Sequence, residues 1–495
     1  MFQKISSSFE KYSESNAFCI QDVFFTYREL GKRINGIVSI LKAVKSTNIG
    51  IIAHDDIETY ASVLAVLFSG KTYVPVNPAY PGERIQNMLE QAEIDTVLTS
   101  KIADTENIFS DQNKYDFIST FRIQYAWHTL HIPDVSAENK AYILFTSGST
   151  GIPKGVPISY KNLDAFCDAF FAQGFDMNEN DRVLQMVDLT FDLSVMSFLM
   201  PLCAGACVYT VPPGDIKFAA TYSILEKHRI TFAMMVPSIL GFLKNYFSEI
   251  RLEDMRYSLF CGEALYAGLA KQWAKCIPNA AIFNVYGPTE ATVFCMAYEL
   301  EKKEAIKEKN DIVCLGKTMK NTLAMIVDEN LSPVSDGTYG ELCLSGAQLT
   351  RGYIKNPLKN NEVFFKYVDT NTEHLFYRTG DICCKDADGN FFYKCRLDDQ
   401  IKIQGYRVEL GEVEFYARKF TNDKNAAAIA CPDTSGKTII RLYVENFIQK
   451  KELEDYLRAK LPAYMIPSEI ISINIFPLNA HGKTDKKALL KMINC

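Results

Sequence analysis

The sequence lacks the patterns that mark several specialised protein classes. Its 14 cysteines include no repeated CxxC pair and no Cys/His cluster at zinc-ligand spacing. Many cysteines lie in apolar segments, which is typical of reduced, buried thiols in a cytosolic protein. No stretch of about 18 uncharged apolar residues occurs, so we expect no membrane span. The first residues, MFQKISSSFEKYSE, have no apolar signal core, and we therefore expect a cytoplasmic protein.

The sequence also has no excess of positive charge. Lys plus Arg number 53 and Asp plus Glu number 59, which gives a formal net charge of −6. An acidic chain lacks the electrostatic footprint of a nucleic-acid-binding protein, so we expect no nucleic-acid partner. Any phosphate site must be built locally, from backbone N–H groups and a few well-placed cations.

The remaining pattern indicates more than one domain, since 495 residues are too many for one hydrophobic core. Short apolar runs alternate with helical patterns in the first part of the chain, beginning with a helix after the capping box Thr26–Glu29. This alternation predicts parallel strands covered by helices. The predicted strands are Ile49–Ala53, Thr96–Leu98, Tyr142–Phe145, Arg182–Val187, Cys207–Val211, Thr231–Val236, Ser258–Cys261 and Ile282–Val285.

From about Ile312 the pattern changes to short antiparallel strands, which predicts a β-rich subdomain. The charged segment Arg396–Gln400 then marks a boundary. The fold class expected is α/β with a β-rich subdomain. A large N-terminal domain would span residues 1–397. A small, mobile α+β domain would span residues 398–495, with strand, helix, strand, strand, helix, strand and terminal helix.

The strongest single motif is YILFTSGSTGIPKG, residues Tyr142–Gly155. It has the pattern of a strand running into a loop with four hydroxyl residues, three glycines and one lysine. Glycines let backbone N–H groups approach a phosphate, and the hydroxyls and Lys154 add donors. It is not a Walker A loop, because Gly155 follows Lys154 where Ser or Thr is required. The alternative interpretation is a plain surface turn.

Two weaker groups follow. In NVYGPTE, residues 284–290, Tyr286 could offer a flat face to a base, and Glu290 could hold Mg²⁺, which prefers carboxylate oxygens. The alternative is a Gly-Pro turn with a solvated glutamate. The third group comprises Tyr377–Asp381, Arg396–Asp398 and Lys402–Arg407, where a carboxylate at a strand start could accept two ribose hydroxyls. The alternative for each charged residue is a solvated strand end.

Together these groups resemble the adenylate-forming superfamily, which includes acyl-CoA synthetases, firefly luciferase and amino-acid adenylation domains. The resemblance covers nearly the whole chain, because many landmarks occur in family order. These landmarks are Phe25–Leu30, Tyr73–Pro81, Thr146–Gly155, Phe191–Val195, Asn284–Glu290, Gly340–Leu342, Arg351–Tyr353, Tyr377–Asp381, Gln400–Arg407 and His481–Asp485.

The resemblance implies a reaction with two steps. An acid carboxylate attacks the α-phosphate of ATP, giving an acyl-AMP and pyrophosphate. The small domain then rotates about a hinge at Asp398, and the phosphopantetheine thiol of a carrier protein attacks the adenylate. ATP and Mg²⁺ are the implied cofactors, Glu290 the implied metal ligand, and Lys483, Glu290 and Thr289 the implied catalytic residues. The implied ATP-binding residues are Thr146, Ser147, Gly148, Ser149, Thr150, Gly151, Lys154, Asn284, Tyr286, Gly287, Asp381, Arg396 and Lys483.

Within the superfamily the sequence resembles the amino-acid branch. Asp192 matches the position where that branch places an aspartate against the substrate ammonium, although it could equally cap a helix beginning at Leu193. The motifs Phe191–Met196 and Phe260–Leu265 resemble the D-alanine–carrier protein ligases, which favours D-alanine as the substrate. The implied side-chain pocket is entirely apolar and would leave a charged substrate side chain without a partner. Its residues are Leu193, Met196, Met234, Leu259, Cys261, Val285, Val293 and Phe294.

Some residues depart from the family pattern, namely Cys395, His481, Lys486 and a bulkier Phe294 than a D-alanine ligase would have. The alternatives left open are adenylation of another small or apolar amino acid in a nonribosomal peptide pathway, a CoA ligase for a small acid, and an inactive nucleotide sensor. Asp192 argues against the CoA ligase, and the retained charged residues argue against the sensor. We expect a monomer.

Overall fold

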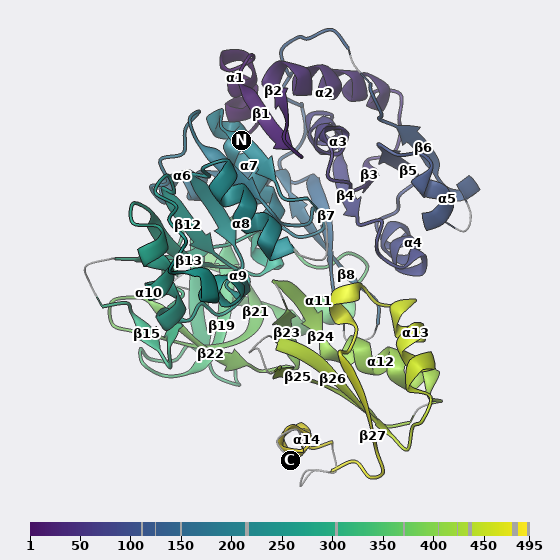
Figure 1. The fold of residues 1–495 in the computed structure, drawn as a ribbon, viewed down its shortest axis with the longest axis vertical. Coiled ribbons are helices and arrows are strands. Elements are labelled where there is room, and N and C mark those ends of the chain that lie inside the picture. Colours follow the sequence, from purple (N-terminus) through teal and green to yellow (C-terminus); the bar gives the residue numbers. More distant parts are fainter. Residues whose placement is uncertain are drawn as a thin grey trace.

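The computed structural model describes residues 1–109, 112–123, 125–148, 151–212, 217–301, 305–369, 372–403, 405–422, 424–433, 438–477 and 484–492. Its large N-terminal part contains two mainly parallel sheets (Figure 1). The nine-stranded sheet is parallel from β13 to β1 and antiparallel at both edges. Its order is β17 (Lys317–Thr318), β14 (Met296–Leu300), β13 (Ala281–Tyr286), β12 (Tyr257–Phe260), β11 (Phe232–Met235), β9 (Arg182–Gln185), β10 (Cys207–Thr210), β1 (Asn16–Ile20) and β2 (Val23–Thr26).

The six-stranded sheet is parallel except for its last strand, β8, which returns antiparallel along β7. The β7–β8 connection is the Gly/Ser-rich loop singled out from the sequence. The order is β6 (Asp116–Ser119), β5 (Thr96–Thr99), β3 (Asn48–Ile52), β4 (Thr72–Val76), β7 (Lys140–Thr146) and β8 (Lys154–Ser159). All eight strands predicted for this part of the chain are therefore present, within a few residues of their expected ends.

Two almost wholly buried helices, α3 and α7, lie between these sheets, and the ring of Tyr60 on α3 meets that of Phe198 on α7 at 5.8 Å. The predicted capping box at Thr26 is confirmed, since its hydroxyl and Glu29 exchange hydrogen bonds with each other's backbone. The helices are α1 (Phe2–Lys11), α2 (Tyr27–Leu41), α3 (Ile57–Phe68), α4 (Gly82–Gln91), α5 (Asp104–Ile108), η1 (Gln112–Lys114), α6 (Tyr160–Ala172), α7 (Leu193–Ala204), α8 (Lys217–Lys227), α9 (Ser238–Leu243), η2 (Lys244–Tyr246), α10 (Ala267–Cys276) and η3 (Thr289–Ala291).

The β-rich subdomain follows, as predicted. The five strands of its main sheet, β18 to β22, pair antiparallel, and Gly389, with φ of 85°, turns the chain between β21 and β22. The elements are β15 (Glu308–Lys309), β16 (Ile312–Val313), β18 (Thr322–Val327), β19 (Gly340–Gly346), α11 (Pro357–Val363), β20 (Phe364–Asp369), β21 (Thr372–Lys385) and β22 (Phe391–Arg396).

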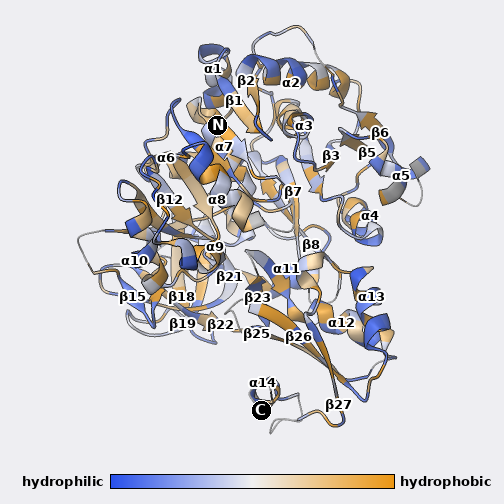
Figure 2. Cartoon of the chain, in the orientation of Figure 1, coloured by the Kyte–Doolittle hydropathy of each residue, from blue (hydrophilic) through white to orange (hydrophobic). Residues whose placement is uncertain are grey.

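The small C-terminal domain, yellow-green to yellow in Figure 1, has its own core, built from residues between Ile403 and Ile470. The sequence predicted one strand before its first helix, whereas the structure has a hairpin, because Gly405 takes φ of 82° and reverses the chain. Strands β25 and β26 are strongly apolar, while α13 is mainly hydrophilic (Figure 2). The elements are β23 (Gln400–Ile403), β24 (Tyr406–Glu409), α12 (Leu410–Phe420), β25 (Ala426–Pro432), β26 (Thr438–Glu445), α13 (Lys450–Arg458), η4 (Ala463–Met465), β27 (Glu469–Ile473) and α14 (Lys486–Lys491).

The thirteen cysteines in the described part of the chain are all unpaired, and twelve of them are buried, as their apolar sequence contexts predict. No helix within the described ranges combines the length and the apolar character needed to cross a bilayer.

Candidate functional site

The β23–β24 hairpin of the small domain lies against the loops at the carboxyl ends of the large domain's strands. The backbone N–H of Gly405, at the hairpin tip, donates to Glu263 Oε1 at 2.8 Å. Ser147, in the Gly/Ser-rich loop, donates its hydroxyl to the Arg407 carbonyl at 3.0 Å and accepts from the Glu409 N–H at 3.1 Å. The Ser147 side chain therefore ties the loop to the backbone of the hairpin through two hydrogen bonds.

Glu290 is a fully buried charge at this junction, with no exposed surface. Its carboxylate accepts from the Tyr353 hydroxyl at 2.5 Å and from Arg407 Nη1 at 3.0 and 2.9 Å. Burial works to raise the pKa of Glu290, but the Arg407 guanidinium and the Tyr353 hydroxyl outweigh it and hold the pKa at about 2. Glu290 is therefore ionised at neutral pH, and Arg407 supplies its counter-charge in this arrangement.

Lys154, the first residue of β8, has a similar arrangement with the charges reversed. Its Nζ lies 3.0 Å from Glu409 Oε1 and 5.7 Å from the centre of the Tyr353 ring. Burial and the neighbouring Arg407 lower the pKa of Lys154, although Glu409 partly offsets them. A predicted phosphate-binding lysine and a predicted metal-binding carboxylate are thus each paired with a side chain of the small domain.

Asp381 on β21 lies opposite Arg396 on the neighbouring strand β22. It accepts from the Tyr286 hydroxyl at 2.5 Å and from Arg396 Nη1 at 2.8 Å. The Arg396 guanidinium also forks onto both oxygens of Asp398, at 2.6 and 2.9 Å. The predicted base-stacking tyrosine, ribose-binding residues and hinge residue therefore form one hydrogen-bonded chain.

A cavity of about 180 Å³ opens between these groups. Cationic side chains from both parts of the molecule line it, together with several carboxylates. The cations suit an anionic ligand, and the carboxylates suit a cation bound with that ligand. The cationic lining residues are Lys154, Lys359, Arg378, Arg396 and Arg407.

Asp192 lies at the start of α7 and is only 8 % exposed. The side chain makes no hydrogen bond that caps the helix, and its Oδ2 has no partner in the described part of the chain. Burial raises the pKa of Asp192 to about 6, although a hydrogen bond from Thr289 opposes the shift. The helix-cap interpretation therefore loses its main support. The charge of Lys402 acts on Asp192 from a distance, but no ion pair to the carboxylate forms among the described residues, so the site suits a cationic ligand.

The eight residues predicted to line a side-chain pocket all belong to the same buried cluster and are at most 7 % exposed. Phe294 packs edge-on against Phe166, with ring centres 5.1 Å apart. Burial raises the pKa of the Cys261 thiol to about 12, so this thiol is neutral at physiological pH and is no nucleophile.

Sequence reasoning missed Gln348, whose buried amide donates to the backbone carbonyls of Ala291, Thr292 and Phe294 at 3.2, 3.3 and 2.9 Å. The segment that it holds includes Thr292 and Val293, with φ of 54° and 70°. β-Branched residues rarely adopt such angles, so this loop stays in a strained conformation only while outside contacts hold it. Gln348 belongs to no motif, and no local pattern distinguishes it.

Some predicted residues are placed differently or not at all. The Asn284 amide donates to the carbonyls of Val313 and Cys314, at 3.3 and 2.8 Å, and so ties β13 to the next segment. Gly287 packs so tightly that a Cβ would lie 2.4 Å from the Phe294 Cα. Ser149, Thr150 and Lys483 lie outside the described residues. The nucleotide roles of all these residues stay predictions.

Both the sequence and the fold are similar to those of known proteins. The profile of the family described as "AMP-binding enzyme" matches residues 6–354. Zwittermicin A synthase ZmaJ of Bacillus cereus is 31% identical, covering 94% of this chain and 89% of its own length. Tyrocidine synthase 1 of Brevibacillus parabrevis is also 31% identical, covering 97% of this chain. The crystal structure of the Vibrio cholerae adenylation domain AlmE, in complex with glycyl-adenosine-5′-phosphate, superimposes with a TM-score of 0.89 at 26% identity, covering 99% of this chain and 97% of that one.

The chain spans less than half the length of the first curated relatives that it matches. It corresponds to 44% of tyrocidine synthase 1 and to less than a tenth of the larger peptide synthetases. What those whole proteins assemble therefore does not transfer directly to this chain.

Proposed function

The chain belongs to the AMP-binding enzyme family, within the adenylate-forming superfamily, and we propose that it activates a small amino acid as its aminoacyl-AMP. The reaction consumes ATP and releases pyrophosphate. The aminoacyl group then passes to the phosphopantetheine thiol of a carrier protein.

Asp192 is the observation that carries this proposal. An ionised carboxylate in an apolar surrounding is costly unless a cation neutralises it. The ammonium group of an amino acid supplies that cation and would bind the oxygen that has no partner among the described residues. A fatty acid or another simple acid has no such group, which favours an amino acid over the substrate of a CoA ligase.

The cationic cavity supports the ATP half of the reaction. Lys154 would take the outgoing pyrophosphate, Thr289 would lie by the α-phosphate, and Asp381 with Arg396 would take the ribose. The Glu290 carboxylate fits a divalent cation, because the Arg407 guanidinium already holds a positive charge against both of its oxygens. Mg²⁺ bound there would neutralise phosphate charge, which is the main need in phosphoryl chemistry.

The present arrangement suits the second half-reaction. Lys154 and Glu290 are engaged by Glu409 and Arg407 of the small domain, so these pairs must separate before Lys154 and Glu290 can hold pyrophosphate and metal. Rotation of the small domain about Asp398 would separate them. In the adenylating orientation Lys483 would reach the α-phosphate, as its family position implies, and its loop would then move away for thiol attack.

The apolar pocket favours a small side chain. Phe294 fills space beside Phe166, and the eight lining residues are almost fully buried. We propose D-alanine as the substrate, with Cys261 limiting the side chain to a methyl group of one configuration. Glycine is the closest competitor, since the similar AlmE structure holds glycyl-adenosine-5′-phosphate.

ATP–pyrophosphate exchange over a panel of acids tests the proposal. D-alanine should react best, with glycine, L-alanine and serine weaker and short fatty acids inactive. Asp192→Ala should lower exchange several hundredfold, because leaving a buried charge unpaired costs about 3–5 kcal/mol. Asp176→Ala, which removes an exposed carboxylate, is the matched control and should change little. Best turnover with an aromatic or charged amino acid would reject the substrate, and activity with fatty acids alone would reject the reaction.

Lys483→Ala tests the two-orientation mechanism. A cation placed at the reacting phosphate is worth about 3–4 kcal/mol, so exchange should fall by at least ~100-fold. Supplied with preformed aminoacyl-AMP, the same variant should still load a carrier thiol at close to the normal rate. Lys491→Ala, on the exposed face of α14, should harm neither step. Equal loss of both steps in Lys483→Ala would contradict the hinge mechanism.

A further inference from the structure

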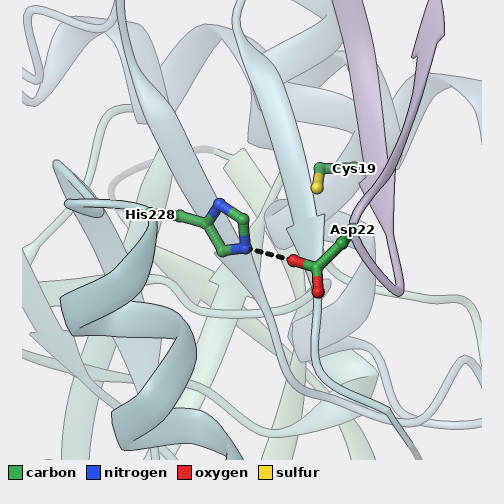
Figure 3. A group of neighbouring side chains, drawn as sticks. All are labelled: Cys19, Asp22 and His228. Carbon is green, nitrogen blue, oxygen red and sulfur yellow. Dashed lines mark hydrogen bonds and ion pairs between the residues drawn. The ribbon is translucent and has the colours of Figure 1, made fainter.

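A second group of reactive side chains lies far from the nucleotide cavity, at the edge of the nine-stranded sheet (Figure 3). Cys19 comes from β1, Asp22 from the turn between β1 and β2, and His228 from the residue that follows α8. One potential ligand atom of each lies within 4.8 Å of the others. The β1–β2 hairpin and the end of α8, 206 residues apart at Asp22 and His228, therefore converge on one point.

The local structure holds each of these side chains in place. Gln21 and Asp22 form a tight two-residue hairpin turn with φ of 50° and 65°, which fixes the point where the Asp22 side chain leaves the backbone. The His228 ring lies against Tyr209, with centres 4.9 Å apart, and its Nε2 meets Asp22 Oδ1 at 2.9 Å. Cys19 is only 3 % exposed. The site is thus held by packing and backbone geometry before any ion binds.

The surroundings of Cys19 raise the pKa of its thiol. Burial and the negative charge of Asp22 raise the pKa of the Cys19 thiol to about 11, although the backbone N–H of Asp22 is directed at the sulfur and opposes the shift. On the neighbouring strand, burial and the proximity of Cys19 raise the pKa of Cys207 to about 12. Ligation of a metal by Cys19 would require loss of the thiol proton, which a divalent cation at this point favours.

We propose that Cys19, Asp22 and His228 form a binding site for a zinc-type divalent transition-metal ion. Thiolate and imidazole select such ions over Mg²⁺ and Ca²⁺, which require oxygen ligands. Zinc bonds of about 2.0–2.3 Å place tetrahedral ligands roughly 3.5 Å apart, so small rotations of the exposed Asp22 side chain complete the geometry. Three protein ligands leave the fourth position to solvent. The bound ion would tie the β1–β2 hairpin to the end of α8.

Lys227 competes with the metal for the same carboxylate. Its ammonium lies 2.6 Å from Asp22 Oδ2, so it already supplies part of the positive charge that the ion would bring. If Lys227 competes with a metal ion for Asp22, its removal has a different effect from the loss of a purely structural ion pair. Removing the ammonium should strengthen metal binding rather than weaken the cluster.

Cobalt(II) spectroscopy and zinc competition with a chromophoric chelator test the proposal on the full chain, without reference to activity. The protein with one equivalent of Co²⁺ should show a thiolate-to-cobalt charge-transfer band, which Zn²⁺ abolishes. Cys19→Ser should remove the band, and both Cys19→Ser and His228→Gln should weaken Zn²⁺ binding by on the order of 100-fold. Lys227→Met should tighten it.

Cys395→Ser and His374→Gln serve as controls, because they remove an exposed thiol and an imidazole elsewhere in the chain. Both should leave the band and the affinity unchanged. Thermal unfolding adds a second measurement, since Zn²⁺ should raise the Tm of the wild type but not of His228→Gln. Zinc affinity that is equal in the wild type and both ligand variants, or a band that Cys395→Ser removes, would overturn the proposal.

Discussion

Two buried carboxylates near the proposed reaction centre have opposite titration behaviour. Burial acts on both, yet the pKa of Asp192 rises to about 6, whereas that of Glu290 falls to about 2. The difference is Arg407, which contacts both oxygens of Glu290, while one oxygen of Asp192 has no partner in the described structure. Asp192 is therefore the one of these two carboxylates that forms no ion pair among the described residues, although the charge of Lys402 acts on it from a distance.

Asp192→Asn should stabilise the free protein above pH 6. The pKa of Asp192 is about 6 in the folded state and 3.8 in the unfolded state. Below pH 3.8 the carboxyl group is protonated in both states, so the folded protein has no free-energy cost from a buried charge. The penalty grows between these values and reaches roughly 3 kcal/mol above pH 6, at about 1.4 kcal/mol per pKa unit. Urea unfolding at pH 7.5 should show the variant more stable by up to that amount, and the gain should disappear near pH 4. A variant that is less stable than the wild type at pH 7.5 would contradict the assignment of an unpaired charge.

At the scale of a single element, the η3 segment and the loop after it show how a strained backbone is maintained. Thr292 and Val293 occupy the left-handed region at a cost of about 1–2 kcal/mol each. The Gln348 side-chain amide donates hydrogen bonds to three backbone carbonyls of this loop. In return, the Thr292 hydroxyl donates to the backbone carbonyl of Gln348 at 2.5 Å. The loop follows Thr289 and Glu290 directly, so its shape sets where these side chains lie.

Gln348→Ala should therefore lower both stability and activation. Leaving buried carbonyls without donors should cost roughly 1–3 kcal/mol in the free energy of unfolding. A shift of about 1 Å at Glu290 would reduce pyrophosphate exchange by about 100-fold. Denaturant titration and exchange kinetics measure the two effects. Gln272→Ala, on the exposed face of α10, is the control. Normal exchange in Gln348→Ala would show that the loop keeps its shape without the amide.

On the scale of the whole molecule, ion pairs join the small domain to the large one, and some of these pairs are buried whereas others are exposed. Arg84 on α4 and Glu412 on α12 are 7% and 0% exposed and meet at 2.5 Å. Lys460 and Glu83 form a nearby pair in which Glu83 is more than half exposed. The aromatic rings of Tyr406 and Tyr464 stack at 4.1 Å, and Phe191 of the large domain packs edge-on against Tyr406.

Arg84→Met should weaken this arrangement of the domains. The variant leaves Glu412 buried without its cation, at a cost of about 3–5 kcal/mol, and rotation of the small domain is the easiest way to return that carboxylate to water. Transfer from preformed aminoacyl-AMP to a carrier thiol should fall by roughly 100-fold or more. Pyrophosphate exchange should stay close to normal.

The double variant Arg84→Met/Glu412→Gln should recover much of the transfer rate, since it removes both charges. Lys460→Met breaks an exposed pair and should cost no more than about 1 kcal/mol. Loss of exchange and transfer together in Arg84→Met would point instead to a folding defect and reject a role confined to one orientation.

The sequence by itself determined the strand and helix pattern, the two-part division and the proposed chemistry. These depend on local signals, such as the capping box at Thr26, the apolar runs of the parallel strands and the glycine-rich motif before Lys154. The hairpin at Gly405 was merged into one strand because a single glycine does not reveal whether the chain reverses there.

Only the tertiary structure decided which charges meet. Glu290 and Arg407 are separated by 117 residues, and Asp22 and His228 by 206, so no spacing rule connects them. Gln348 likewise depends on a loop more than 50 residues away. Periodicity and motifs record what a residue does with its near neighbours in the chain, whereas burial and pairing of charge depend on which distant segments the packed core brings together.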